Sequence, residues 1–178
     1  QKLYSDNNKW HKPVESLGGE AVYRYRFNND GLLKVYGAYS SVNFDLTQED
    51  INEIDGVRFG LKNRNLYVNT SYKDFLEKDW SIATGVSFAN DRSDLKFSSA
   101  NITDIENSAH FKFTLNKYFS SRYKLNFGAE YFITNFTENY NDDTIENEYG
   151  FDNTIFSSFI ETDIFFSKNL ATKIGIRG

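Results

Sequence analysis

The feature that most constrains the fold is a regular alternation of apolar and polar residues over residues 109–140. In the first arm, Phe111 and Phe113 alternate with Lys112 and Thr114. After residues 119–122 the second arm alternates in the same way, with Tyr123, Leu125, Phe127, Ala129, Tyr131 and Ile133 opposed to Lys124, Asn126, Gly128 and Glu130. Successive side chains of a β-strand point to opposite faces. The stretch therefore predicts a hairpin whose apolar face lies against a protein layer or against lipid.

Similar alternation recurs along the chain. It predicts further strands over residues 17–28, 32–46, 56–75, 80–88 and 150–166, and another beginning at Leu170. Residues 1–16 are predicted to be a loop. Within 56–75 the apolar phase slips, because Phe59 and Leu61 are odd-numbered whereas Leu66 and Val68 are even-numbered. A β-bulge near residues 62–65 is expected to cause this slip.

The predicted connections alternate in length. Short turns are expected at residues 28–31, 76–79, 119–122 and 167–169, and long polar loops at 47–55, 98–106 and 139–148. Aromatic residues flank the short turns: Phe27, Phe75, Trp80, Tyr118, Phe119, Tyr123, Phe165 and Phe166. Short periplasmic turns, long external loops and aromatic girdles are typical of outer-membrane barrels. We therefore expect an all-β, antiparallel up-and-down transmembrane β-barrel with about eight strands visible, part of a larger barrel.

The composition agrees with this class. The chain has 178 residues, no cysteine and a net charge of −5, which exclude disulfides and argue against a nucleic-acid partner. Mean hydropathy is −0.60, and no apolar run is long enough for a transmembrane helix. A barrel strand tolerates low hydropathy, because only every second residue faces lipid. The last alternating stretch, 170–178, stops in mid-pattern, so we expect residues 1–178 to be a single barrel segment that is incomplete at its C-terminus.

Few residues carry a signal for chemistry. His11 and His110 have no convergent second ligand, and each is expected to be an ordinary polar residue. Two acidic stretches offer oxygen ligands: one contains Glu49, Asp50, Glu53 and Asp55, and the other contains Asn141, Asp142 and Asp143. Both lack the spacing of a calcium-binding loop, so they are expected to be solvated. No nucleophile elbow, phosphate-binding loop or metalloprotease motif is present. We expect no enzymatic activity, no metal site and no cofactor.

The polar faces of the predicted strands carry charges of both signs. These residues are Lys112, Lys124, Glu130, Glu161, Asp163, Lys173 and Arg177. In a membrane barrel they would line the interior. A small barrel would pack them as ion pairs in a filled core, whereas a large barrel would turn them toward water, an internal domain or a ligand. The sequence leaves both arrangements open.

The stretch 165–178 resembles a recurring hairpin of TonB-dependent receptors. Two aromatics end one strand, Ser167-Lys168-Asn169-Leu170 forms the turn, and Lys173, Gly175 and Arg177 follow in a Lys-x-Gly-x-Arg pattern. The resemblance implies a parent barrel of about 22 strands with an internal plug. It also implies import of a scarce ligand, such as a metal chelate, cofactor, glycan or peptide, with energy relayed from the inner membrane. No plug segment is visible in this sequence.

The first functional hypothesis is therefore a segment of an outer-membrane receptor that is located in the bacterial outer membrane. Its expected partners are outer-membrane lipid, an inner-membrane energy-coupling protein reached through parts outside this chain, and other outer-membrane proteins. A small or accessory barrel with a structural, adhesion or assembly role is a second hypothesis. A soluble β-barrel that binds a ligand is the third, since period-two alternation is equally compatible with it.

Overall fold

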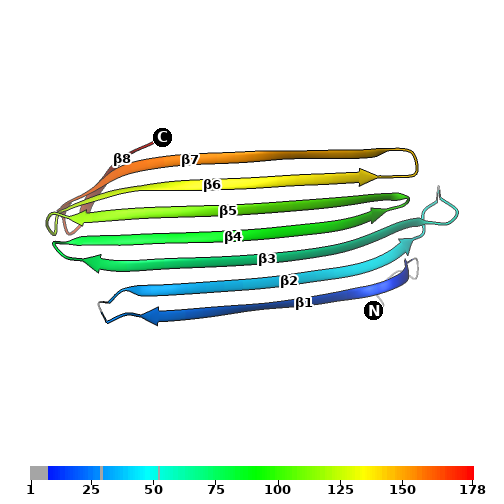
Figure 1. The fold of residues 1–178 in the computed structure, drawn as a ribbon, viewed down its shortest axis with the longest axis horizontal. Helices are drawn as coiled ribbons and strands as arrows, with labels where there is room; N and C mark the ends of the chain where they lie inside the picture. Colours follow the sequence, from blue (N-terminus) through cyan, green and yellow to red (C-terminus); the bar gives the residue numbers. More distant parts are fainter. Residues whose placement is uncertain (1–7, 29, 52) are drawn as a thin grey trace.

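The computed structural model describes residues 8–28, 30–51 and 53–178, and these form one antiparallel sheet of eight strands in sequence order (Figure 1). The strands are β1 (Asn8–Arg26), β2 (Leu32–Gln48), β3 (Val57–Leu76), β4 (Trp80–Phe97), β5 (Ala100–Tyr118), β6 (Tyr123–Asn141), β7 (Glu146–Ser167) and β8 (Leu170–Arg177). Every strand pairs with its neighbours in sequence. The prediction of an all-β up-and-down meander is confirmed.

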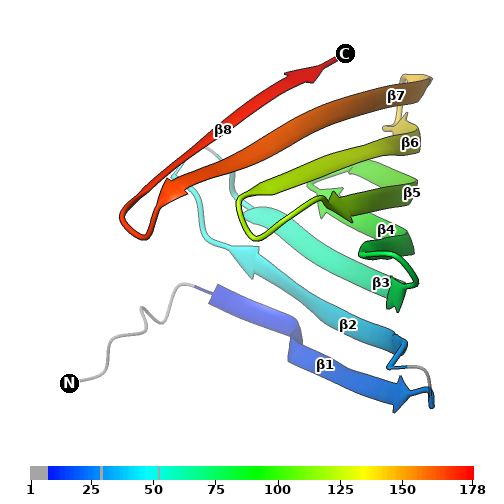
Figure 2. The ribbon, with the colours of Figure 1, turned by 90° about the vertical axis from the view of Figure 1, so that its left-hand side faces the viewer.

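The sheet is curved and open. Figure 2 shows it bending from β1 to β8 as part of a barrel wall, and within the described residues β1 and β8 are not paired. The hairpin predicted at 109–140 is β5–β6, in which Phe111 pairs with Tyr131 and Lys112 with Glu130. Within the described residues, no helix is long and apolar enough to cross a membrane.

Several strands are longer than predicted. Residues 98–106 are not a loop, because β4 and β5 are joined by Ser98 and Ser99 alone. The predicted loop at 139–148 shrinks to residues 142–145. A loop is present between β2 and β3 as predicted, but it starts later than residue 47, because β2 continues to Gln48. Polar composition was misleading at these positions: most residues of 98–106 and 139–148 are hydrophilic, yet the backbone ladders are continuous up to the tight turns.

The predicted leading loop is also wrong where the structure describes it, since β1 begins at Asn8. Residues 1–7 lie outside the described part, as do Asn29 and Asn52. Pro13 lies within the second of two register shifts in β1, which occur at Trp10/Lys12 and at Lys12/Glu15. Proline lacks the N–H needed for a regular ladder, and bulges on edge strands are where it is tolerated.

The predicted bulge in β3 is absent. The register of β3 is continuous from Val57 to Lys73 against β2 and from Phe59 to Leu76 against β4. Phe59 and Leu61 therefore point to the face opposite Leu66 and Val68. The phase slip in the sequence therefore arises because the apolar residues of β3 change from one face of the sheet to the other.

Candidate functional site

One face of the sheet carries an exposed apolar band next to the short turns. Val86, Phe111, Tyr131 and Phe156 occupy paired positions on β4–β7 and are 51%, 47%, 40% and 66% exposed. Along β4 the band covers residues 80–88 and ends where Asn90 follows on the same face. About 9–11 tilted strand residues cross a bilayer, so this height matches the hydrocarbon layer.

The opposite face is polar and more covered. Three of the four buried polar residues in the described part of the chain lie here, since Ser81, Asn126 and Glu130 are only 8%, 5% and 6% exposed; the fourth, Asp74, is at the short-turn end of β3 on the other face. Side chains on the inner side of a curved sheet crowd together, which places this polar face on the concave side of the wall seen in Figure 2. Alternation thus separates a polar interior from an apolar exterior over the height of the band, as in membrane barrels.

The concave face of β5–β8 holds a group of paired charges, here called the charged ladder: Lys112, Lys124, Glu130, Glu161, Asp163, Lys173 and Arg177. Glu130 is its centre. Its Oε1 lies 2.6 Å from Lys112 Nζ, and its Oε2 accepts a 2.9 Å hydrogen bond from Arg177 Nη2. The nearly buried carboxylate is thereby neutralised by cations from both sides.

The rest of the ladder lies closer to the short turns. Lys173 Nζ is 3.1 Å from Glu161 Oε2 and 3.6 Å from Asp163 Oδ1. Asp163 also accepts a 3.0 Å hydrogen bond from Asn126 Nδ2 and lies 3.9 Å from Lys124 Nζ. The structure therefore brings together all seven charged residues that the alternation assigned to the polar face.

The two histidines lie far apart in the fold. The His110 ring stacks on Phe132 at 3.8 Å, on the concave face beside a 330 Å³ hollow lined by the small residues Ala83, Gly85 and Ser87. His11 Nε2 is 2.8 Å from Thr47 Oγ1 on the convex face, near the end of the sheet opposite the short turns. In the described part of the chain, no group of three or more His, Asp or Glu side chains is placed to hold a metal ion.

The acidic stretches have local roles. Glu49, Glu53 and Asp55 border a 420 Å³ hollow in the β2–β3 loop. Asp142 organises the β6–β7 turn, since it accepts hydrogen bonds from the backbone N–H groups of Thr144 and Ile145 at 2.7 and 2.8 Å. The backbone bond from Thr144, together with the bonds from Tyr140, the Thr144 hydroxyl and Ile145, lowers the pKa of Asp142 to about 2.

Beyond the band the polarity of the two faces is reversed. The concave face there carries the group that we call the apolar mouth: Trp10, Phe44, Leu46, Phe59, Leu61, Leu95, Phe97 and Ile102. The rings of Trp10 and Phe44 are 6.5 Å apart, and those of Phe44 and Phe59 are 5.6 Å apart. The sequence does not predict this cluster, because the phase slip in β3 that signals it is also the pattern that a bulge produces.

Comparison with solved structures shows the fold in which such a wall occurs. The chain is similar to the ferric yersiniabactin uptake receptor FyuA of Yersinia pestis, with a TM-score of 0.65 at 9% identity over 91% of this chain and 27% of that one. The alcaligin outer membrane receptor FauA of Bordetella pertussis matches with a TM-score of 0.39 at 9% identity, over 90% of this chain and 40% of that one. No protein-family model and no curated protein matches the sequence.

The comparison with FyuA confirms that the chain resembles a segment of a TonB-dependent receptor barrel at the level of fold. The chain spans about a quarter of the length of FyuA. It corresponds in fold to part of a barrel wall.

Proposed function

We propose that the chain forms part of the wall of an outer-membrane β-barrel receptor that takes up a scarce ligand with the help of an inner-membrane energy-coupling protein. The observation that carries this proposal is the reversal of polarity between the two ends of the sheet. Next to the short turns the convex face is apolar over the height of a bilayer. Farther along the strands, after a polar stretch that contains Asn63, Asn65, Asp91 and Ser93 on the concave face, apolar residues occupy that face. A soluble barrel would have no reason to carry its apolar residues on opposite faces at its two ends.

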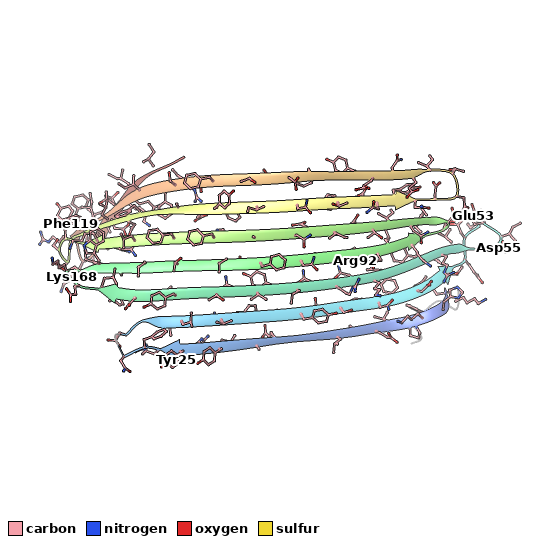
Figure 3. All side chains as sticks on the ribbon, viewed as in Figure 1. Tyr25, Glu53, Asp55, Arg92, Phe119 and Lys168 are labelled. Carbon is pink, nitrogen blue, oxygen red and sulfur yellow. The ribbon has the colours of Figure 1, made fainter. Side chains whose placement is uncertain are left out.

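The reversal of polarity also gives the orientation of the strands across the membrane. The band starts directly at the short turns, where aromatic rings gather, and the strands continue far beyond it only at the other end. Figure 3 shows Tyr25, Phe119 and Lys168 at the short-turn end and Glu53 and Asp55 at the opposite end. Short turns face the periplasm in outer-membrane barrels. The apolar mouth is then at the external opening, and the charged ladder is at membrane depth.

The openness of the sheet supports a large barrel over a small accessory one. Eight strands can close into a narrow barrel, but β1 and β8 remain apart among the described residues (Figure 2). In a wide barrel the charged ladder faces a lumen that has room for water, an internal domain or a passing ligand. Apolar and aromatic side chains at the mouth would contact the ligand first, which favours a metal chelate or another ligand with apolar groups.

Cell fractionation and uptake test the proposal. The full-length protein is expected in the outer-membrane fraction, with a heat-modifiable mobility on gels, and its deletion is expected to abolish growth on one scarce ligand in a strain with an intact energy-coupling system. Growth should be lost equally when the coupling protein is deleted. Recovery of the protein from the soluble fraction would overturn the membrane assignment. Uptake that does not need the coupling protein would overturn the active-transport assignment.

A further inference from the structure

The convex face carries a group of cations just beyond the apolar band. This group, here called the basic patch, consists of Lys12 on β1, Arg58, Lys62 and Arg64 on β3, and Arg92 and Lys96 on β4. Leu66 is the last apolar residue of the band on β3, and Arg64 follows it on the same face. Figure 3 shows Arg92 at this level of β4, between the short-turn end and the external loop.

Nearby carboxylates neutralise only part of this charge. Asp45 forms a two-pronged ion pair with Arg58, at 2.6 and 3.0 Å. Asp94 lies 2.9 Å from Arg92 and 3.8 Å from Arg64. With Glu15 beside Lys12, the patch holds three carboxylates against six cations, so it keeps a net charge of +3.

The two lysines at the centre of the patch are available to a ligand. Lys62 and Lys96 are exposed, and neither forms an ion pair within 4.0 Å among the described residues. The Nε atom of Arg64 is buried without a hydrogen-bond partner in the described structure. Arg58, Lys62 and Lys96 also border a 520 Å³ groove on this face. The patch therefore offers free donors around a hollow.

The ion pairs persist at neutral pH. The hydrogen bonds from Arg58 hold the pKa of Asp45 below its ordinary value. Partial burial raises the pKa of Asp94, but the hydrogen bonds from Arg92 and Thr103 and the charge of Arg64 outweigh it, and the net pKa is lowered. Both carboxylates stay ionised. The uncompensated charge of the patch is therefore that of Lys62 and Lys96, plus one further charge because Arg64 and Arg92 share the carboxylate of Asp94.

The charge is local to β1–β4. On β7, the convex face beyond the band carries Glu146, Glu148 and Asp152 instead. The whole chain has a net charge of −5. A cationic patch on an acidic protein, placed at one level beside the lipid-facing band, is the arrangement that binds anionic lipid headgroups.

We propose that the basic patch binds the phosphorylated saccharide headgroup of a lipopolysaccharide molecule in the outer leaflet, an inference that rests on the outer-membrane location proposed above. The height of the patch favours this glycolipid over a phospholipid. From Arg64 to Arg58 the cations cover about 20 Å along the strand, which is about 15 Å of height at the usual tilt of a barrel strand. The headgroup layer of a phospholipid bilayer is only about 5–8 Å thick on each side. A taller headgroup with several phosphates reaches the whole patch.

Native mass spectrometry of the full-length protein in detergent, with added deep-rough lipopolysaccharide, tests the proposal. The test variant is K62Q/K96Q. The matched control is K34Q/K73Q, which removes the same charge from the concave face of β2 and β3. One lysine near an anionic surface contributes about a fivefold change in affinity, so the test variant is expected to bind about 30-fold more weakly and the control to bind normally. Removing the phosphates of lipopolysaccharide with phosphatase is expected to weaken its binding to the native protein. The loss should equal the one that K62Q/K96Q causes with the intact lipid.

The outcomes separate this inference from the proposed function. A K62Q/K96Q protein that is heat-modifiable in the outer membrane but binds lipopolysaccharide like the native protein would overturn the inference alone. Equal binding of phosphatidylethanolamine and lipopolysaccharide, or competition by millimolar inorganic phosphate, would also overturn it. If K62Q/K96Q does not fold, K62Q alone is measured and a fivefold loss is expected. Absence of the native protein from the outer membrane would overturn the proposed function first.

Discussion

Arg177 on β8 reaches across β7 to bind Glu130 on β6, with its Nη2 atom 2.9 Å from the carboxylate. Where the Arg177 side chain crosses β7, its guanidinium carbon lies 6.0 Å from the centre of the Phe159 ring. The contact joins residues 47 positions apart on strands that are not neighbours. It therefore ties the last described strands to the β5–β6 hairpin.

Removing the Glu130 carboxylate should destabilise the wall. Glu130→Gln keeps the shape of the nearly buried side chain but removes the negative charge that Lys112 and Arg177 share. Because both cations are more than half exposed and can be solvated, the expected loss is about 1 kcal/mol of unfolding free energy. Glu161→Gln is the matched control, because Lys173 keeps Asp163 as a partner. Urea unfolding in detergent, followed by heat-modifiable mobility, measures both. Equal losses in the two variants would contradict the central role of Glu130.

Adjacent residues on β4 should respond oppositely to charge. Val86 is on the apolar band and Ser87 is on the concave face beside the small-residue hollow. Val86→Arg should cost about 2 kcal/mol in folding into lipid vesicles, because arginine is then exposed to hydrocarbon. Ser87→Arg is expected to cost much less. A larger penalty at Ser87 would mean that the faces are assigned the wrong way round.

Gly128 lies under an aromatic ring. A Cβ atom added there would lie 2.8 Å from Phe159 Cζ and would collide with the carbonyl oxygen of Phe113. Because the carbonyl belongs to the backbone ladder, Gly128→Ala should cost about 1–3 kcal/mol. Gly37→Ala on β2 is the control, since nothing lies within 4 Å of its added Cβ. Thermal unfolding in detergent should show a lowered midpoint for the first variant only.

The two tryptophans should report opposite environments. Trp80 packs on Phe127 at the short-turn end of the apolar band, whereas Trp10 is in the apolar mouth. In vesicles of brominated lipid, the fluorescence of a Trp10→Phe variant, which retains Trp80, should be strongly quenched. A Trp80→Phe variant, which retains Trp10, should keep most of its fluorescence. Quenching of both would place the mouth in lipid.

The β6–β7 turn should stay ordered into strong acid. The pKa of Asp142 is lowered to about 2, against about 3.9 in an unfolded chain. A lowered folded-state pKa means that this contribution to stability is complete above about pH 4 and is lost as pH falls through about 2. The carboxyl carbon of Asp142 should titrate at about 2 by NMR. Asp142→Ala should unprotect the Thr144 and Ile145 amides at every pH, and Asp143→Asn should not.

Much of the membrane-level structure was predictable from sequence. Alternation at Leu33 and Val35 or at Phe111 and Phe113 identified strands and faces, because one side must contact apolar surroundings there. The charged ladder was assigned to the polar face by the same rule. The pairing of Arg177 with Glu130 was not predictable, since it depends on a contact across an intervening strand.

The strand ends beyond the apolar band were harder to predict. Where the convex face contacts water, its residues are polar too, and the alternation of apolar and polar residues weakens. Residues 98–106 are polar at most positions, and their Ser, Asn and Asp residues are compatible with a turn at several points, so the sequence does not mark Ser98 and Ser99 as the whole connection. Alternation at Phe59 and Leu61 was visible, but its opposite phase to Leu66 was assigned to a backbone irregularity. A change of environment along a straight strand produces the same pattern as a bulge, and only the register distinguishes them.

The change of apolar side within β3 has a consequence for how such strands can evolve. One residue inserted between Leu61 and Leu66 would bring both ends of the strand into phase, and would turn either its lipid-facing or its mouth-facing residues the wrong way. Two residues inserted together would keep both the lipid-facing and the mouth-facing residues of β3 on their proper faces. The insertion would only move the apolar mouth farther from the membrane. Such walls can therefore change height in steps of two residues, made in neighbouring strands together. The lengths of the paired strands are inherited as a set.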